Sequence, residues 1–329
     1  MAPSALRPFP RLVGDIGGTN ARFALLDGPD GELRSIRTLA CADFPGLAEA
    51  IEHYLSATVG ATPRYCALGI AAPLDGDLVS MTNHDWTFSA GALRERFRFA
   101  LLHLVNDFTA LATALPALAN DDLRQTGGGT PLARHAIGLL GAGTGLGVSG
   151  LLPCGTDYVP IEGEGGHVTL AANDPHEAAL IERLATRYEH VSAERVLSGP
   201  GLVALYEALA AVRRESPDGM DAQDIIRRGL DGSSSLCVGT LDAFCAFLGT
   251  VASDLALTLG ARGGIYIGGG IVPRLGEYFL RSPFRRRFEH KGRYSSYLNA
   301  IPTYVIVAPH AGLTGAARIL DREIAMSFS

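Results

Sequence analysis

Apolar and polar residues follow one another along the first third of the chain in blocks that predict a mixed α/β fold. Short apolar runs at 12–13, 21–28 and 32–41 are typical of strands joined by turns. Residues 46–58 instead carry apolar side chains at helical spacing, and residues 64–74 return to the pattern of a buried strand. The order strand, strand, strand, helix, strand indicates an α/β layer.

Residues 101–118 contain the clearest junction between a strand and a helix. An apolar run ends at Val105, Asn106 and Asp107 follow it, and a helical pattern begins there. Ligand-binding groups in open α/β sheets lie at the carboxyl ends of strands, which makes both polar residues candidates for a site. The simpler alternative is that they only cap the helix.

Three glycine-rich turns interrupt apolar runs, at 14–20, 141–147 and 268–270. Turns without Cβ atoms let backbone N–H groups approach phosphate oxygens, so the three turns predict a nucleotide site. The first and second turns also suggest two halves that open with the same hairpin. The G-x-G-x-x-G pattern at 145–150 runs on into an apolar segment rather than a helix, which argues against a dinucleotide site.

The carboxylate of Asp15 distinguishes the first turn from an ordinary one. Phosphoryl transfer uses Mg²⁺, which binds one or two carboxylates, so Asp15 is a candidate metal ligand. The common alternative is that Asp15 only accepts hydrogen bonds from nearby backbone groups in an Asx-turn.

The rest of the chain predicts further α/β elements and a boundary. Helical patterns dominate 202–214 and 241–260, and the third glycine turn is expected to lead into a helix. A last strand at 303–308 and a short helix at 311–320 complete the prediction. The glycine-rich segment at 126–131 predicts a break near a domain boundary.

Composition narrows the class of protein. A length of 329 residues suggests two domains, and 40 glycines are roughly 12% of the chain against a usual ~7%. A net charge of -6 argues against a nucleic-acid partner, and the basic cluster at 285–293 is expected to be a solvated helix face. Five cysteines without a C-x-x-C pair favour reduced thiols. We expect no signal peptide and no apolar run long enough to span a membrane, and therefore a soluble cytoplasmic protein.

Seven segments, in order over nearly the whole chain, resemble bacterial glucokinases of the hexokinase, Hsp70 and actin superfamily: GDIGGTNARFAL, MTNHDW, VNDFTA, GAGTGLG, GEGGHV, SAERVLSGPG and GGIVPR. The resemblance implies two ribonuclease-H-like (actin-like ATPase) α/β domains, 1–117 with 304–329 and 118–303, with ATP and glucose in the cleft between them. It implies transfer of the ATP γ-phosphate to the 6-hydroxyl of glucose, and a homodimer.

The resemblance also implies the site residues. Asp15 would hold Mg²⁺ and Asp107 would be the general base. The sugar would be bound by Asn106, Asp107, Glu164, His167 and Glu194. ATP would be bound by Gly14, Asp15, Ile16, Gly17, Gly18, Thr19, Asn20, Gly143, Thr144, Gly145, Gly269 and Gly270.

Several alternatives remain open at the level of sequence. Glu194 could be an acidic residue in the first turn of a helix, and Trp86 could be a core residue rather than a wall of the cleft. Glu164 and His167 have the E-x-x-H spacing of a metal motif on a helix, although the glycines between and beside them disfavour a helix at 163–166. Thr169 stands where the family often has an acid. The rival functions are a kinase of mannose, fructose or glucosamine, an actin-like or chaperone ATPase, and a sugar-responsive repressor. The repressor would need a DNA-binding helical module before the first glycine turn, and only thirteen residues precede Gly14.

Overall fold

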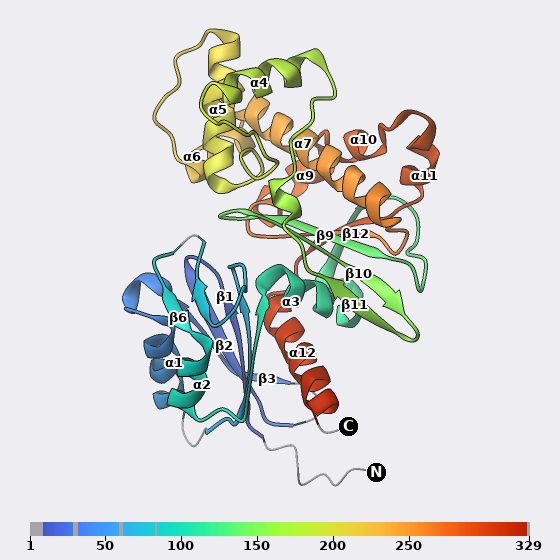
Figure 1. The fold of residues 1–329 in the computed structure, drawn as a ribbon. Helices are drawn as coiled ribbons and strands as arrows, with labels where there is room; N and C mark the ends of the chain where they lie inside the picture. Colours follow the sequence, from blue (N-terminus) through green and yellow to red (C-terminus); the bar gives the residue numbers. More distant parts are fainter. Residues whose placement is uncertain (1–8, 29–31, 59–61, 83, 328–329) are drawn as a thin grey trace. The chain divides into compact units, whose positions relative to one another are not determined.

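The computed structural model describes residues 9–28, 32–58, 62–82 and 84–327 and consists of two compact units (Figure 1). The first unit comprises Met1–Leu118 and Ala308–Ser329, and the second comprises Ala119–Val307. Each unit is built on a mixed sheet covered by helices, which confirms the predicted α/β class.

The first unit contains a five-stranded sheet in the order β3-β2-β1-β4-β7. β1, β4 and β7 are parallel, whereas β1, β2 and β3 form an antiparallel meander, as the sequence predicted. The strands are β1 (Arg11–Ile16), β2 (Asn20–Leu26), β3 (Leu33–Ala40), β4 (Tyr65–Ile70) and β7 (Leu101–Asn106); β5 (Leu78–Ser80) and β6 (Thr87–Ser89) form a separate hairpin.

Helices cover both faces of this sheet because its strands alternate apolar side chains between the faces. Leu12 and Ile16 of β1 pack into one core with α1, whereas Val13 packs into the other with α12. The helices are α1 (Leu47–Ser56), α2 (Ala90–Phe97), α3 (Asp107–Ala114) and α12 (Ala311–Ser327). A Cβ at Gly315 of α12 would lie 1.7 Å from the Ala110 carbonyl oxygen, so the close packing of α12 on α3 requires glycine there.

The second unit contains a six-stranded sheet in the order β11-β10-β9-β12-β13-β8. Its strands are β8 (Leu123–Gly127), β9 (Ile137–Ala142), β10 (Leu146–Cys154), β11 (Asp157–Ile161), β12 (Ile265–Gly268) and β13 (Thr303–Ile306). β9 and β10 form the same kind of antiparallel hairpin that β1 and β2 form in the first unit, although β8 precedes them in the chain.

Helices make up most of the rest of the second unit, and they surround the long helix α7 (Figure 1). They are α4 (Pro175–Ala185), α5 (Gly199–Arg213), α6 (Ala222–Leu230), α7 (Ser235–Leu259), α8 (Val272–Leu275), α9 (Glu277–Arg281), α10 (Phe284–Glu289) and α11 (Ser295–Asn299). The helix expected after the third glycine turn is divided into α8 and α9 at Gly276, whose φ of 54° lies in the left-handed region.

Helix α7 corrects one expectation from composition. Its 25 residues are long and apolar enough to cross a membrane by length and composition alone. Most of the helix is buried inside the protein, however, and it carries Leu241, Phe244, Phe247 and Leu248 into the core. Its apolar character is therefore that of a central core helix.

The end of the chain also differs from the prediction. Residues after 303 were assigned to the first unit, but β13 pairs in parallel with β12 and antiparallel with β8 in the second sheet. The second unit therefore ends at Val307. The final helix, α12, is 17 residues long rather than short, because apolar residues at helical spacing continue to Ile324.

Trp86 is a core residue of the first unit, which was one of the two alternatives. Its side chain is 3% exposed and its Nε1 donates to the Phe44 carbonyl oxygen at 3.1 Å.

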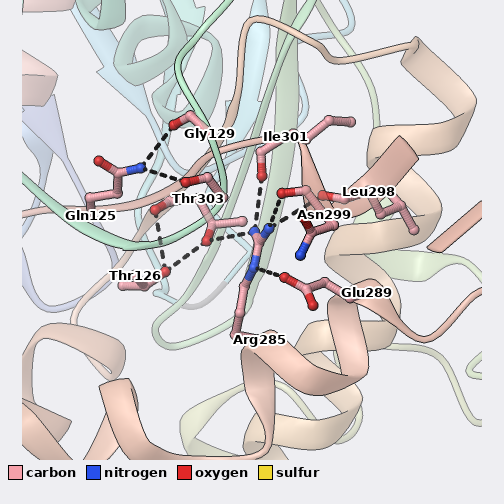
Figure 2. Close-up of polar contacts among 10 residues, drawn as sticks. Gln125, Thr126, Gly129, Arg285, Glu289, Leu298, Asn299, Ile301 and Thr303 are labelled. Carbon is pink, nitrogen blue, oxygen red and sulfur yellow. Dashed lines mark hydrogen bonds and ion pairs between the residues drawn. The ribbon is translucent and has the colours of Figure 1, made fainter. Parts of the chain in front are cut away.

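The basic cluster at 285–293 is not a solvated helix face. Arg285 is largely buried and donates to the carbonyl oxygens of Leu298, Asn299 and Ile301, to Thr303 Oγ1 and to Glu289 Oε1, at 2.6–3.3 Å (Figure 2). Arg287 pairs with the buried Glu177 and with Asp174. Arg286, between them, is exposed. Alternate arginines thus connect α10 to α4 and to the segment before β13.

Asp174 supplies a pH-dependent contribution to stability. Its carboxylate accepts a hydrogen bond from Glu177 N at 2.9 Å and lies 3.0 Å from Arg287 Nη2. The hydrogen bond from the Glu177 backbone is the largest cause of a lowered pKa of Asp174, and Arg287 contributes in the same direction. A lowered carboxyl pKa gives stability that is present above the pKa of the unfolded chain and lost as pH falls through the folded pKa. We expect Asp174→Asn, which keeps the cap, to cost about 0.5 kcal/mol at pH 7, a small value because the group is exposed. Urea unfolding at pH 7 and pH 3 should show the difference shrinking in acid; a constant difference would contradict the assignment.

Candidate functional site

The first glycine turn connects β1 to β2 and places Asp15 at the carboxyl end of β1. Gly17 N donates to Asn20 O at 3.0 Å, which closes the turn, and Thr19 is exposed at its tip. The side chain of Ile16 is fully buried, so only the backbone of Ile16 can reach a ligand.

The Asp15 carboxylate is held between Arg22 and the first turn of α12. Arg22 Nη1 lies 3.1 Å from Asp15 Oδ2, whereas within the described residues no donor meets Oδ1. A Cβ at Gly312 would lie 2.9 Å from Asp15 Cγ and 3.1 Å from each carboxylate oxygen. Burial raises the pKa of Asp15 and outweighs the opposite effect of Arg22.

Asn106 and Asp107 occupy the predicted junction between β7 and α3. Asn106 is the helix cap, because its Oδ1 accepts from Phe108 N at 2.9 Å and from Thr109 N at 3.2 Å. Asn106 therefore caps α3, and this contact leaves the amide nitrogen of its side chain as a donor. Asp107 is the first residue of α3, and its Oδ1 accepts from Phe108 N at 3.0 Å.

The pairing of three parallel strands relates Asp15 to Asp107. Asp15 is level with Gly69 of β4, and Gly69 is level with Val105 of β7, two residues before Asp107. One strand therefore separates β1, which carries Asp15, from β7, which Asp107 directly follows, and the two strands lie roughly 10 Å apart. A Cβ at Gly69 would lie 3.1 Å from Ala110 Cβ, so glycine lets α3 pack closely against β4 beside Asp107.

The second and third glycine turns lie against each other in the second unit. A Cβ at Gly141 would lie 2.5 Å from the Gly268 carbonyl carbon, and Ile271 N donates to Ala142 O at 3.1 Å. Gly269 has a φ of 79°, which favours glycine. The predicted nucleotide-binding residues Gly143, Thr144, Gly145, Gly269 and Gly270 therefore belong to two turns in direct contact.

The amino terminus of α5 meets the second turn. Gly199 N donates to Gly143 O at 2.8 Å, and Gly143 N donates to Gly145 O at 2.8 Å. Ser198 caps α5, since its Oγ accepts from Gly201 N at 3.0 Å. Helix amino termini favour anions through their free N–H groups and dipole.

Glu164, His167 and Glu194 are brought together beside the same turn. His167 Nε2 lies 3.9 Å from Glu164 Oε2 and 4.0 Å from Glu194 Oε1. Glu194 Oε2 accepts from Leu146 N at 2.9 Å, directly after the second turn. Glu194 precedes α5 rather than lying in its first turn.

The E-x-x-H spacing of Glu164 and His167 does not form a metal motif on an α-helix. Residues Gly165–His167 make a single 3-10 turn, as the glycines suggested. Within the described part of the chain, no three His, Cys, Asp or Glu side chains cluster as metal ligands.

Sequence reasoning missed three residues at these turns. Arg22 and Gly312 contact Asp15, and Ser198 caps the helix that meets Gly143. Only Ser198 carries a local signal, a capping residue followed by Pro200 in the first helical turn. The contact of Gly312 with Asp15 joins residues 297 positions apart and leaves no local pattern.

A family model described as Glucokinase matches residues 12–323. The chain belongs to the glucokinase family. A glucokinase of Aromatoleum aromaticum is 55% identical over 318 residues, which cover 96% of this chain and 96% of that protein. The crystal structure of a glucokinase from an Antarctic psychrotroph is 37% identical with a TM-score of 0.85 and covers 96% of this chain and 100% of that one. These matches confirm the predicted family and the predicted activity, an ATP-dependent kinase of glucose.

A more distant structure supports the fold assignment. A ROK family glucokinase from Streptomyces griseus, in complex with glucose and AMPPNP, is 20% identical with a TM-score of 0.67 and covers 95% of this chain and 100% of that one. The likeness to this glucokinase confirms the actin-like ATPase fold expected from the sequence.

Proposed function

We propose that this glucokinase transfers the γ-phosphate of ATP to the 6-hydroxyl of glucose with Asp107 as the general base. The supporting observation is the position of Asp107 at the carboxyl end of β7, on the same edge of the sheet as Asp15. The carboxylate removes the hydroxyl proton as the sugar oxygen bonds to the γ-phosphorus, and the bond from that phosphorus to the leaving ADP oxygen breaks.

The remaining hydroxyls of the sugar are bound by Glu164, His167 and Glu194, together with the amide nitrogen of Asn106. Two carboxylates, each within 4.0 Å of the His167 imidazole, can accept from neighbouring hydroxyls, and the imidazole can donate to one. This positioning is the main catalytic contribution in an in-line phosphoryl transfer.

The phosphates of ATP are bound by the glycine turns. Three features of the second unit support this assignment: the two turns in contact, the left-handed Gly269, and the amino terminus of α5 at Gly143. In the first unit the corresponding residues are Gly17, Gly18, Thr19 and Asn20, in the turn between β1 and β2.

Asp15 fits a role as a Mg²⁺ ligand. Its Oδ1 meets no donor within the described residues, and one carboxylate is what Mg²⁺ requires when phosphates and water supply its other oxygens. A bound Mg²⁺ neutralises charge on the transferred phosphate. Arg22 holds Oδ2 and thereby fixes the orientation of the carboxylate.

A coupled assay of ADP release across glucose, mannose, fructose and glucosamine tests the proposal. We expect turnover that depends on sugar, ATP and Mg²⁺ and is highest with glucose. A preference for another hexose would transfer the proposal to that sugar, and ADP release that does not depend on any sugar would favour an ATPase instead. If no hexose increased ADP release, the proposed transfer of phosphate to a sugar would be wrong.

We also propose a cytoplasmic homodimer. The family resemblance suggests the dimer, and the five free cysteines suit a reducing compartment. Light scattering should give about twice the 34.6 kDa of one chain, and a mass of one chain would contradict the dimer.

Replacement of Gly312 should weaken Mg²⁺ activation. The Cβ of Gly312→Ala would lie 2.9–3.1 Å from the Asp15 carboxyl group and displace it. We expect the Mg²⁺ concentration for half-maximal activity to rise about ten-fold or more, the effect of disturbing the orientation of a metal ligand. Gly219→Ala is the control, since nothing lies within 4 Å of its added Cβ. Equal Mg²⁺ dependence in the two variants would contradict the role of Gly312.

A further inference from the structure

Cys41 contacts the first glycine turn through both its side chain and its backbone. Its Sγ lies 3.3 Å from the Gly17 carbonyl oxygen, and its backbone N donates to Thr19 O at 2.9 Å. The residue follows β3 directly and is fully buried among Leu12, Ile16 and other residues of the first core. Two carbonyl groups of one short turn are therefore held by a single residue 22 to 24 positions away in the chain.

The chemistry of the thiol defines the direction of its hydrogen bond. A carbonyl oxygen only accepts, so the thiol must donate. Burial raises the pKa of the Cys41 thiol, which keeps the proton on sulfur at neutral pH.

The planarity of the peptide bond connects this contact to the outer side of the turn. The Gly17 carbonyl and the Gly18 N–H belong to one trans peptide and point in opposite directions. Since Cys41 draws the carbonyl towards the core, the Gly18 N–H points away from the core. Within the described residues, no acceptor meets that N–H.

We propose that Cys41 is a positioning residue for phosphate binding, which orients the Gly18 N–H towards a nucleotide phosphate through its bond to Gly17. The inference rests on the proposed function of the first turn. Cys41 touches neither phosphate nor sugar itself.

A buried cysteine of the same core provides a matched control. Cys66 of β4 is also fully buried and belongs to the same cluster, but no hydrogen bond joins its thiol to the turn. Cys41→Ala and Cys66→Ala remove the same atoms from the same core, and only the first removes the bond to Gly17. Cys41→Ser keeps a donor at that position.

Calorimetric titration with MgADP and, separately, with glucose tests the proposal. We expect Cys41→Ala to bind MgADP about three-fold or more weakly than wild type, the effect of one lost hydrogen bond, with glucose affinity unchanged. Cys41→Ser should bind MgADP more tightly than Cys41→Ala, and Cys66→Ala should bind both ligands as wild type does. Unaltered MgADP affinity in Cys41→Ala, or an equal loss in Cys66→Ala, would overturn the proposal.

A measurement on the wild-type protein covers the case in which the alanine variant does not fold. The amide resonance of Gly18 should shift when MgADP is added, and an unmoved resonance at saturation would count against the inference. Failure of the proposed function is distinguished separately: a wild type without sugar-dependent ADP release removes that function. If the wild type is active and Cys41→Ala binds MgADP with normal affinity, only the proposed role of Cys41 is wrong.

Discussion

Asp107→Asn should lower kcat by about 10²- to 10⁴-fold, the range that a general base contributes. Asparagine has nearly the shape of aspartate and keeps an oxygen that can accept from Phe108 N, as Asp107 Oδ1 does at 3.0 Å. The cap of α3 is supplied by Asn106 and is not altered. What the variant loses is the ability to take a proton, so the loss should appear in kcat with little change in KM for glucose.

The measurement is steady-state kinetics combined with thermal unfolding of both proteins. We expect the melting temperature to remain within a few degrees of the wild-type value. Glu194→Gln provides a contrast, since it changes a residue assigned to sugar binding, and its larger effect should be on KM for glucose. Near wild-type kcat in a folded Asp107→Asn protein would exclude Asp107 as the base.

Arg285→Met should destabilise the second unit by about 1–3 kcal/mol, the usual cost of leaving partly buried acceptors without a donor. Arg285 donates to three carbonyl oxygens before β13 and to Glu289 (Figure 2). Methionine fills similar space but donates nothing, so these acceptors and the carboxylate lose their partner.

The control for this prediction is Arg286→Met on the same helix. Arg286 is exposed and should change stability by less than about 0.5 kcal/mol. Urea unfolding followed by far-UV circular dichroism measures both variants, and the fluorescence of the single tryptophan, Trp86, follows the first unit. A circular dichroism transition in Arg285→Met that matches that of Arg286→Met would contradict the prediction.

Local patterns were sufficient for the elements that build the nucleotide turns. Short apolar runs joined by turns predicted β1, β2 and β3, and helical spacing predicted α1. The glycine turns could be recognised because a turn that approaches phosphate is rich in glycine, and this enrichment is visible in a few consecutive residues. Resemblance to the family then assigned roles that patterns alone could not, such as the base at Asp107.

Contacts between distant residues account for what the sequence did not predict. Arg285 looks like part of a solvated charge run, yet it is largely buried because its acceptors at 298–303 lie beside it in space. β13 was assigned to the first unit because its sequence does not indicate which sheet it joins. Helix α7 resembles a membrane span in composition because a helix buried on most sides and a helix in lipid are both apolar all round.

The divided first unit has a consequence for the order in which the protein folds during synthesis. Residues 119–307 form one continuous stretch, whereas the sheet that starts the chain must wait for residues 311–327 before α12 can cover Val13, Ala24 and Ala67. The unit whose synthesis begins first is therefore completed last. Until the ribosome has released α12, one face of the nascent amino-terminal sheet stays uncovered, a stage at which chaperones would bind it.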